Sequence, residues 1–200
     1  DNSLFFAAIL AYGCNIGLGA MARNSPNISA NSLENVANWY LTLENLQRAN
    51  DKIIALLDKL KIGELFKKDP SIVHTSSDGQ KVLVQVDSIH ANYSYKYFGK
   101  DKGIVIYSFI DEMHRLFHSL TVSSSEREAL YVFEGLLQNQ VVQSDMHSTD
   151  THGTNGINFA LLYLAGIRFI PRIEDFQNQH LYCFADTNLP NLLDYELKLG

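Results

Sequence analysis

The spacing of hydrophobic residues changes near residues 67–70, and this change constrains the fold more than any other feature of the sequence. From residue 31 to about residue 60, apolar side chains recur every three or four positions, which is typical of an amphipathic helix. After the stretch KKDP the apolar residues alternate or form short continuous runs, which indicates strands. We therefore expect a helical segment over residues 1–69, followed by an α/β core over residues 70–200.

The most apolar stretch, residues 4–22, raises the question of a membrane span. Its length suits a spanning helix, and Gly13 and Gly17 have the GxxxG spacing of packed membrane helices. Three glycines and Asn15 in its second half weigh against insertion, as does the absence of a basic flank before it. We expect a buried helix of a soluble protein, with no membrane as partner.

After residue 70 the patterns predict three strands, then a helix, a strand, a helix and a strand. The strands fall at residues 71–80, 103–110, 115–124, 140–148 and 167–173. Ser125 and Glu128 form a capping box for the first of these helices, and Gly166 has the place of a helix-ending glycine after the second. This order predicts a ribonuclease-H-like α/β fold, which is a mixed five-stranded sheet with flanking helices.

Two aspartates stand at the ends of predicted strands. Asp78 closes the first strand within HTSSDGQ, and Asp150 follows the fourth within HSTDTHG. In the predicted fold these strands are parallel neighbours, about 4.8 Å apart, so the two carboxylates are close enough to share a divalent cation. Carboxylate oxygens are the ligands that Mg²⁺ prefers. The alternative is structural, because Asp before Gly is a turn signal and Asp150 also suits the start of a turn before the next helix.

Three histidines near these strand ends leave further alternatives open. His147 and His152, with Asp150 between them, are a ligand set for a single transition metal, so a mononuclear metal hydrolase stays an alternative. His74, His147 and His152 are also candidates for auxiliary roles, although a lone His near a strand end more often forms a structural hydrogen bond. A third alternative is a non-catalytic module that positions DNA or supports assembly.

The stretch at residues 90–103 interleaves aromatic and basic side chains. Cations on phosphates beside rings that stack on bases are how single strands are held, but an exposed hairpin with solubilising lysines has the same pattern. Arg168 and Arg172 flank the last predicted strand and suit either a phosphate or a carboxylate such as Asp175. The net charge of −6 weighs only weakly against DNA, because it does not say where the cations lie. The candidate DNA-binding residues are Lys96, Tyr97, Lys100, Lys102, Arg168 and Arg172.

A series of blocks covers essentially the whole chain in a specific order. The blocks are GCNIGLGAMA, WYLTLENLQRA, HTSSDGQ, HANYSYKYFG, HSTDTHG and LAGIRFIPRI. In them the chain resembles the DDE transposases of the Tn-three family, which move transposons by a replicative route that forms cointegrates. The resemblance implies that Asp78 and Asp150 are the first and second catalytic carboxylates and hold Mg²⁺ or Mn²⁺. It also implies DNA cleavage and strand transfer at transposon ends, by a homo-oligomer in the bacterial cytoplasm.

The third carboxylate of that family is a glutamate after a further helical stretch, and it has no place on this sequence because Glu174 and Glu196 come too early. The chain begins with Asp rather than Met and ends in LKLG. We therefore expect a fragment whose core is incomplete at its C-terminal end and which is inactive alone. One departure from the family is His152, where relatives often have a smaller residue. Two cysteines are too few for a disulfide framework, which indicates a reduced cytosolic protein.

Overall fold

The computed structural model of the chain describes residues 2–139, 141–175, 178, 180–181 and 198–199. The chain divides into two compact units, Asp1–Lys61 and Ile62–Gly200, which are described separately below. The division falls a few residues before the KKDP stretch. The domain limits expected from the sequence, 1–69 and 70–200, stay a prediction.

The first unit is helical, as expected. Its helices are α1 (Asn2–Gly13), α2 (Leu18–Asn24), α3 (Ala30–Tyr40) and α4 (Leu43–Leu57). The apolar stretch that raised the membrane question is broken between α1 and α2, where Asn15 and Gly17 adopt positive φ angles of 53° and 80°. No helix among the described residues is long and apolar enough to cross a membrane. A small core forms around Ala7, Ala8 and Leu33.

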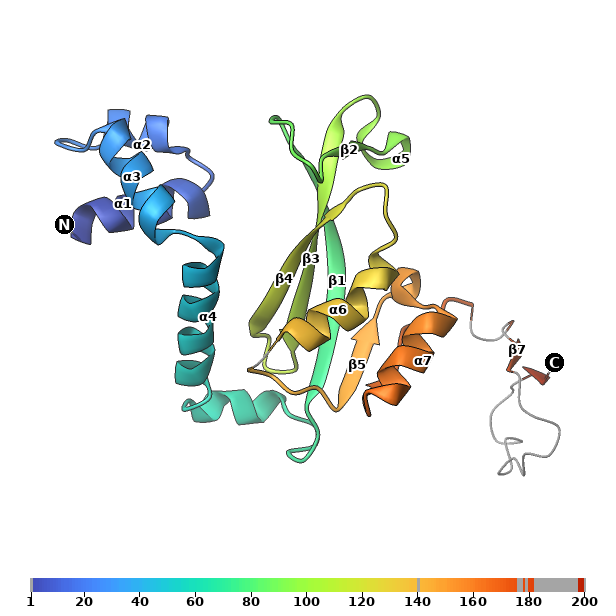
Figure 1. Ribbon diagram of the computed structural model, residues 1–200. Coiled ribbons are helices and arrows are strands. Elements are labelled where there is room, and N and C mark those ends of the chain that lie inside the picture. Colours follow the sequence, from blue (N-terminus) through green and yellow to red (C-terminus); the bar gives the residue numbers. More distant parts are fainter. Residues whose placement is uncertain (1, 140, 176–177, 179, 182–197, 200) are drawn as a thin grey trace. The chain divides into compact units, whose positions relative to one another are not determined.

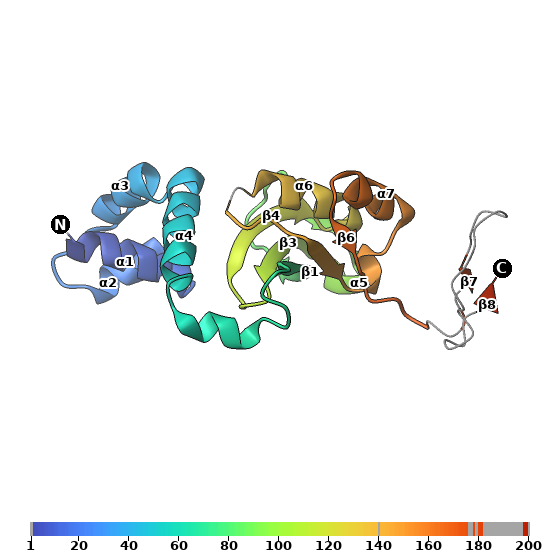
Figure 2. The same cartoon turned by 90° about the horizontal axis from the view of Figure 1, so that it is seen from below.

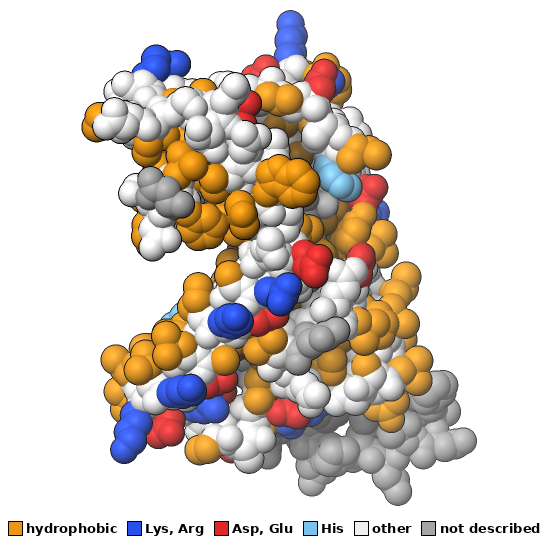
Figure 3. Space-filling model, turned by 60° about the vertical axis from the view of Figure 1, so that its left-hand side comes forward, with side chains coloured by type: hydrophobic (Ala, Val, Ile, Leu, Met, Phe, Trp, Pro, Cys, Tyr) orange, Lys and Arg blue, Asp and Glu red, His pale blue; other side chains and the backbone are white. Residues whose placement is uncertain are grey.

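The single helix predicted from residue 31 to residue 60 is wrong, because the structure divides it into α3 and α4. Thr42 caps the second helix, with its hydroxyl accepting a hydrogen bond from the Asn45 amide at 3.3 Å. The apolar period continues across this break, so the pattern alone did not reveal it. Several large apolar side chains of this unit are exposed, including Trp39 at 77% and Leu43 at 81%. Figure 3 shows one face of the molecule, on which hydrophobic side chains gather in groups between charged ones of both signs.

The second unit is built on a mixed sheet of six strands. The strands are β1 (His74–Leu83), β2 (Asn92–Tyr93), β3 (Lys102–Asp111), β4 (Leu116–Ser123), β5 (Met146–Thr149) and β6 (Arg168–Phe169). Their order is β2-β3-β1-β5-β6, with β4 also paired to β3. β1 runs antiparallel to β3 and parallel to β5, and β5 runs parallel to β6. The ribonuclease-H-like α/β architecture is confirmed, with β2 added to the five predicted strands. A separate pair, β7 (His180–Leu181) and β8 (Lys198–Leu199), lies outside this sheet.

The first strand is longer than predicted and does not end in a turn at Asp78 and Gly79. In the ladder with β3, Asp78 lies opposite Ser108 and Gly79 opposite Tyr107, and the pairing continues to Leu83. β3 is a ten-residue strand, so it provides a hydrogen-bonding partner along the whole length of β1. Pairing across strands therefore overrides the local turn preference of the Asp-Gly dipeptide.

Helices cover one face of this sheet. The two longer helices of this unit are α6 (Tyr131–Gln138) and α7 (Gly156–Leu164). Three short helices precede them, which are η1 (Lys61–Phe66), α5 (Tyr95–Phe98) and η2 (Glu128–Leu130). Figure 1 and Figure 2 show α6 and α7 on the same side of the sheet. On that side β3 buries Val105, Tyr107 and Phe109. A Cβ on Gly135 of α6 would lie 2.0 Å from Cζ of Phe109, so the helix backbone packs directly on that ring.

The two helix-end predictions had different outcomes. Gly166 follows α7 with a positive φ of 76°, as a helix-ending glycine does, so that prediction is confirmed. The capping box is wrong, because α6 begins at Tyr131, with Leu130 at its N-cap and no side-chain cap. The Ser125 hydroxyl instead lies 3.0 Å from the Ser123 hydroxyl and accepts a hydrogen bond from the Asn92 side chain.

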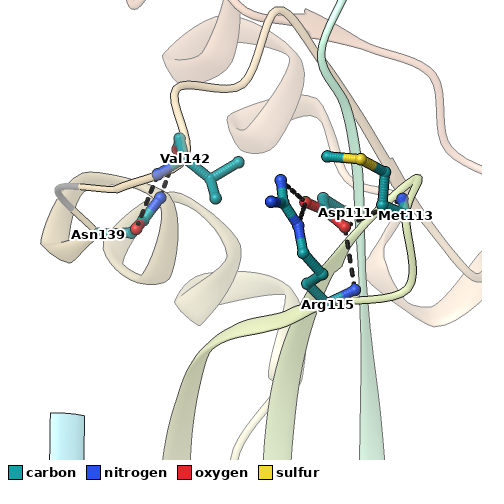
Figure 4. A network of polar contacts seen from close by, with 5 residues as sticks. All are labelled: Asp111, Met113, Arg115, Asn139 and Val142. Carbon is teal, nitrogen blue, oxygen red and sulfur yellow. Dashed lines mark hydrogen bonds and ion pairs between the residues drawn. The ribbon is translucent and has the colours of Figure 1, made fainter. Parts of the chain in front are cut away.

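The turn between β3 and β4 is held by a nearly buried ion pair. Asp111 accepts hydrogen bonds from the backbone amides of Met113 and Arg115, both at 3.0 Å. The Arg115 guanidinium lies 2.6–2.7 Å from the second carboxylate oxygen. Figure 4 shows the Arg115 side chain folded back on Asp111, and beside this hairpin the Asn139 side chain bonded to Val142 after α6. These contacts fix the end of the sheet at which β1 begins, since Thr75 pairs with Asp111.

Candidate active site

The parallel ladder between β1 and β5 brings the two candidate carboxylates together. It has four residue pairs, from His74 with Met146 to Ser77 with Thr149. Asp78 and Asp150 are the next residues on the two strands. Because side chains alternate along a strand, Asp78 and Asp150 lie on the same side of the sheet, opposite the buried Ser77 and Thr149. The prediction that their strands are parallel neighbours is confirmed.

Asp78 is exposed in the middle of β1. Its Oδ1 accepts a hydrogen bond from the Gly79 amide at 2.8 Å. In the part of the chain that the structure describes, no Lys or Arg side chain forms an ion pair with this carboxylate.

Asp150 caps a turn and directly follows Thr149, the last residue of β5 that pairs with β1. Its Oδ1 accepts from the Gly153 amide at 3.1 Å, at the start of the short helix η3 (Thr151–Gly153). Its Oδ2 lies 3.0 Å from Nδ1 of His152. The following helix, α7, is capped by Asn155 instead. The two interpretations of Asp150 from the sequence are therefore compatible, because a carboxylate oxygen that accepts one hydrogen bond keeps a second lone pair.

The turn after Asp150 is held in place by close packing. A Cβ on Gly153 would lie 2.5 Å from Cβ of Thr149, so only glycine lets η3 approach the end of β5 this closely. The buried Asn158 side chain donates to the Gly153 carbonyl at 3.1 Å and to the Ala129 carbonyl at 2.7 Å. Gly153 and Asn158 therefore fix the backbone that follows β5, and with it the direction of the Asp150 side chain.

The three candidate histidines occupy three different environments. His152 is exposed and contacts Asp150. His74 lies at the start of β1, four residues before Asp78 on the same side of the sheet, and its Nε2 lies 2.7 Å from the Ser148 hydroxyl. His147 is fully buried on the opposite side, under the helices, and burial lowers its pKa to about 3, with the nearby His74 as a smaller cause.

The mononuclear metal set of His147, Asp150 and His152 is wrong. Both ring nitrogens of His147 contact hydroxyl groups of β1, on the side of the sheet away from Asp150. Among the described residues, no group of three or more His, Cys, Asp or Glu side chains is arranged to hold a metal ion. The hydroxyl partners, Thr75 and Ser77, are site residues that the sequence did not reveal, although their alternation with Asp78 was visible in HTSSDGQ.

The basic and aromatic residues gather at the far end of β1. Lys96 and Lys81 place their ammonium groups 5.0 and 4.5 Å from the Tyr97 ring centroid. The Lys102 ammonium lies 2.7 Å from Asp87, and this hydrogen bond raises its pKa. Lys100 and Lys102 line an open groove of about 620 Å³, which Asp87 and Asp101 also line. Leu83, at this end, is five residues beyond Asp78, or about 17 Å along the strand.

The two candidate arginines lie at opposite ends of the neighbouring strands. The Arg172 amide donates to the Thr149 carbonyl at 2.8 Å, so its backbone lies beside Asp150. The Arg168 amide donates to the Asp145 carbonyl at 2.9 Å, before β5 begins. The Ser71 hydroxyl and amide, and more weakly the Arg168 charge, lower the pKa of Asp69 at that end. Arg172 is therefore near the carboxylates and Arg168 is not.

Comparison with known proteins agrees with this arrangement. Residues 1–197 match the family described as the Tn3 transposase DDE domain. The chain belongs to this family. It is 32% identical over 171 residues to the transposase for transposon gamma-delta of Escherichia coli K12, covering 84% of this chain and 17% of that relative. It is 31% identical over 183 residues to the transposase for transposon Tn2501 of Escherichia coli, covering 91% of this chain and 18% of that relative.

A third transposase, for transposon Tn1546 of Enterococcus faecium, is 29% identical over 183 residues, which cover 91% of this chain and 18% of the relative. The chain therefore spans less than a fifth of the length of these Tn3-family transposases. The resemblance stated from the sequence blocks is confirmed. A DDE transposase domain implies a divalent metal cofactor in general.

Proposed function

We propose that this chain supplies the first two carboxylates, Asp78 and Asp150, of a Tn3-family transposase that cleaves transposon ends and transfers the strands to target DNA in replicative transposition. The observation that carries the proposal is the β1–β5 register. It runs through Ser77 and Thr149 and leads directly to two acidic residues on the same side of the sheet.

The donor set suits a hard divalent cation. Adjacent strands lie about 4.8 Å apart, so two carboxylates at the same register position of neighbouring strands repel each other unless a cation lies between them. Oxygen ligands select Mg²⁺ or Mn²⁺ over softer metals. Asp78 and Asp150 would hold Mg²⁺, or Mn²⁺ in its place. The metal would supply a more acidic bound water and stabilise negative charge on the phosphate under attack.

The remaining groups would position DNA and the carboxylates. His152 contacts one oxygen of Asp150 and restricts its rotation. Arg172 and, farther along β1, Lys96, Lys100 and Lys102 would meet phosphates, while Tyr97 offers an exposed ring for stacking. The partners would be the transposon ends, the target DNA and further copies of the transposase. The relatives belong to bacterial transposons, so we place this activity in the bacterial cytoplasm.

Metal binding tests the proposal directly. Mn²⁺ titrated into the 200-residue chain should broaden the amide resonances around residues 78 and 150, and Asp78→Asn or Asp150→Asn should abolish this broadening. The matched control is Asp101→Asn, which removes the same charge from the exposed lysine end and should change nothing. Broadening centred elsewhere, or unaffected by both aspartate variants, would refute the assignment.

Activity gives a second test. Because the third carboxylate has no place on this sequence, the isolated chain should show no Mg²⁺-dependent nicking of transposon-end DNA. Nicking by the isolated chain that depends on Asp78 would show that its two aspartates suffice.

A further inference from the structure

A buried polar network lies directly beneath the two carboxylates, on the helix-covered side of the sheet. Its centre is His147 of β5, which is fully buried. Its Nδ1 lies 2.8 Å from the Thr75 hydroxyl and its Nε2 2.9 Å from the Ser77 hydroxyl, both on β1. The Ser77 hydroxyl lies 2.9 Å from the hydroxyl of Tyr107 on β3. One imidazole thus joins β5 to β1 and, through Ser77, to β3.

The network is completed before β5. The Thr75 hydroxyl lies 2.5 Å from the Ser144 hydroxyl, which donates to the Met146 carbonyl at 2.8 Å. One arrangement of protons satisfies every group: Tyr107 donates to Ser77, Ser77 to Nε2, Nδ1 to Thr75, Thr75 to Ser144, and Ser144 to the carbonyl. A neutral imidazole fits this arrangement with one donating and one accepting nitrogen. Networks that are satisfied throughout are rigid and favour a single packing.

We propose that His147 is a positioning residue that fixes the register between β1 and β5 and so holds Asp78 and Asp150 side by side. This inference rests on the proposed function of those two carboxylates. The ring of His147 lies across from its register partner Thr75 and reaches forward to Ser77, the residue before Asp78. The ring therefore hydrogen-bonds to β1 at the two buried positions that precede the Asp78 carboxylate.

The short ladder makes such a device necessary. β1 and β5 share four residue pairs, and backbone hydrogen bonds alone are nearly the same after a shift in register. A shift by one residue would turn His147 to the open face. A shift by two would move the ring away from Thr75 or Ser77 and leave buried polar groups unpaired, which is strongly unfavourable. The ring centroid of His147 lies 6.0 Å from that of Phe109. An apolar residue at position 147 would fill this space but would not favour one register over another.

Amide hydrogen exchange of the 200-residue chain tests the register role without any metal. His147→Phe keeps an aromatic ring, although a larger one, and removes both hydrogen bonds, so protection of the β5 amides, 146–149, should fall at least tenfold more than that of β3 and β4. The matched control is Val132→Ala, a fully buried residue of α6 outside the network, which should lower protection without singling out β5. If His147→Phe shows the same pattern as Val132→Ala, the inference is wrong.

Two milder variants decide the matter if His147→Phe does not fold. Ser77→Ala removes the Nε2 contact between the strands, whereas Tyr107→Phe removes the Ser77 contact with β3 and leaves the His147 contacts in place. Exchange of the β5 amides should rise in Ser77→Ala and not in Tyr107→Phe. Equal effects in both would contradict a specific link from β1 to β5.

Mn²⁺ affinity then connects register to the carboxylates. At a temperature where every variant is folded, His147→Phe or Ser77→Ala should weaken Mn²⁺ binding about tenfold, and Val132→Ala should not. Unchanged affinity in His147→Phe would overturn the positioning role. If the wild-type chain does not bind Mn²⁺ at Asp78 and Asp150, the proposed function fails, while the exchange data still decide whether His147 sets the register.

Discussion

The two halves of β1 have opposite surroundings. Residues 74–77 pair with β3 on one side and β5 on the other, and Thr75 and Ser77 are buried in the network around His147. Residues 78–83 pair with β3, and no described strand pairs with their other side. This second half leads to the lysines and tyrosines near Leu83. One strand thus has an interior half and an open half.

The difference shows how the sheet creates an accessible carboxylate. Asp78 is the first residue of β1 after the ladder with β5 ends, and Asp150 is the first residue after β5 itself. A ligand can approach from the place that a longer β5 would have filled, while the buried half holds both strands in position. The ordered, buried half of β1 therefore leads directly into its accessible half, and Asp78 lies at the junction. Each of the predictions below tests one of the two halves or this junction.

The junction should give the largest effect. Asp78→Asn in a full-length transposase built around this chain should lower strand transfer more than about 1,000-fold, or about 4 kcal/mol, because one carboxylate cannot hold the metal alone. Gln80→Ala is the control, since Gln80 is exposed on the same side two residues farther along. The measurement is the rate of strand transfer at saturating Mg²⁺. Similar losses in both variants would show that the open half, rather than the Asp78 carboxylate, limits the reaction.

The interior half should make stability depend on pH. His147 has a folded pKa of about 3, below its ordinary value of 6.5, so below pH 6.5 the unfolded chain binds the proton more readily than the folded one. Stability is therefore complete above pH 6.5 and falls as the pH is lowered toward 3. The loss is about 1.4 kcal/mol per pH unit, or about 3 kcal/mol by about pH 4.

Urea unfolding between about pH 4 and pH 7 measures this dependence. Burial also lowers the pKa of His118, so the informative quantity is the difference between the wild type and His147→Phe, in which the His118 contribution cancels. Among the described residues, His74 on β1 and Tyr107 on β3 are titratable groups near His147, and both proteins contain them. If the two pH profiles are parallel, His147 is not a buried neutral residue.

The open half should contribute to DNA affinity through charge. Replacing Lys96, Lys100 and Lys102 with Ala should reduce the slope of log affinity against log salt by about 2, since each phosphate contact contributes about 0.7–0.9. Three contacts would give more, but Lys102 already pairs with Asp87. The control triple variant replaces Lys52, Lys59 and Lys61 of the helical unit. An unchanged slope in the first variant would assign its lysines to ordinary solvent-exposed surface.

The sequence predicted those parts of the site that depend on local pattern. The order of the predicted strands and helices indicated a ribonuclease-H-like fold, and this fold was enough to predict that the strands ending near Asp78 and Asp150 are parallel neighbours. Contacts across the sheet were not predictable in the same way. The turn expected at Asp78 and Gly79 does not form, because both residues pair with β3. The Ser125 hydroxyl was expected to cap a helix but contacts Ser123 and Asn92 instead. The His147 network joins residues 70–72 positions apart, which no periodicity reveals.

Glu196 and Cys183, the second of the two cysteines in the sequence, lie outside the described residues, so the structure tests no prediction about them. Cys14, in contrast, is an exposed free thiol. The expectation of a reduced protein stays a prediction. This prediction does not concern either half of β1, because Cys14 and Cys183 lie far from that strand in the sequence.

The smallest effect should come from the two arginines beside β5, and it decides which end of the parallel strands meets DNA. The Arg172 backbone bonds to Thr149, next to Asp150, whereas the Arg168 backbone bonds to Asp145 at the opposite end. Arg172→Ala should therefore lower the salt slope of DNA binding by about 1, the value for a single phosphate contact. Arg168→Ala is the matched control, because it removes the same exposed charge from the same strand region and should leave the slope unchanged. The reverse result would place DNA at the end where β1 begins, near Asp69, and would separate the DNA path from the two carboxylates.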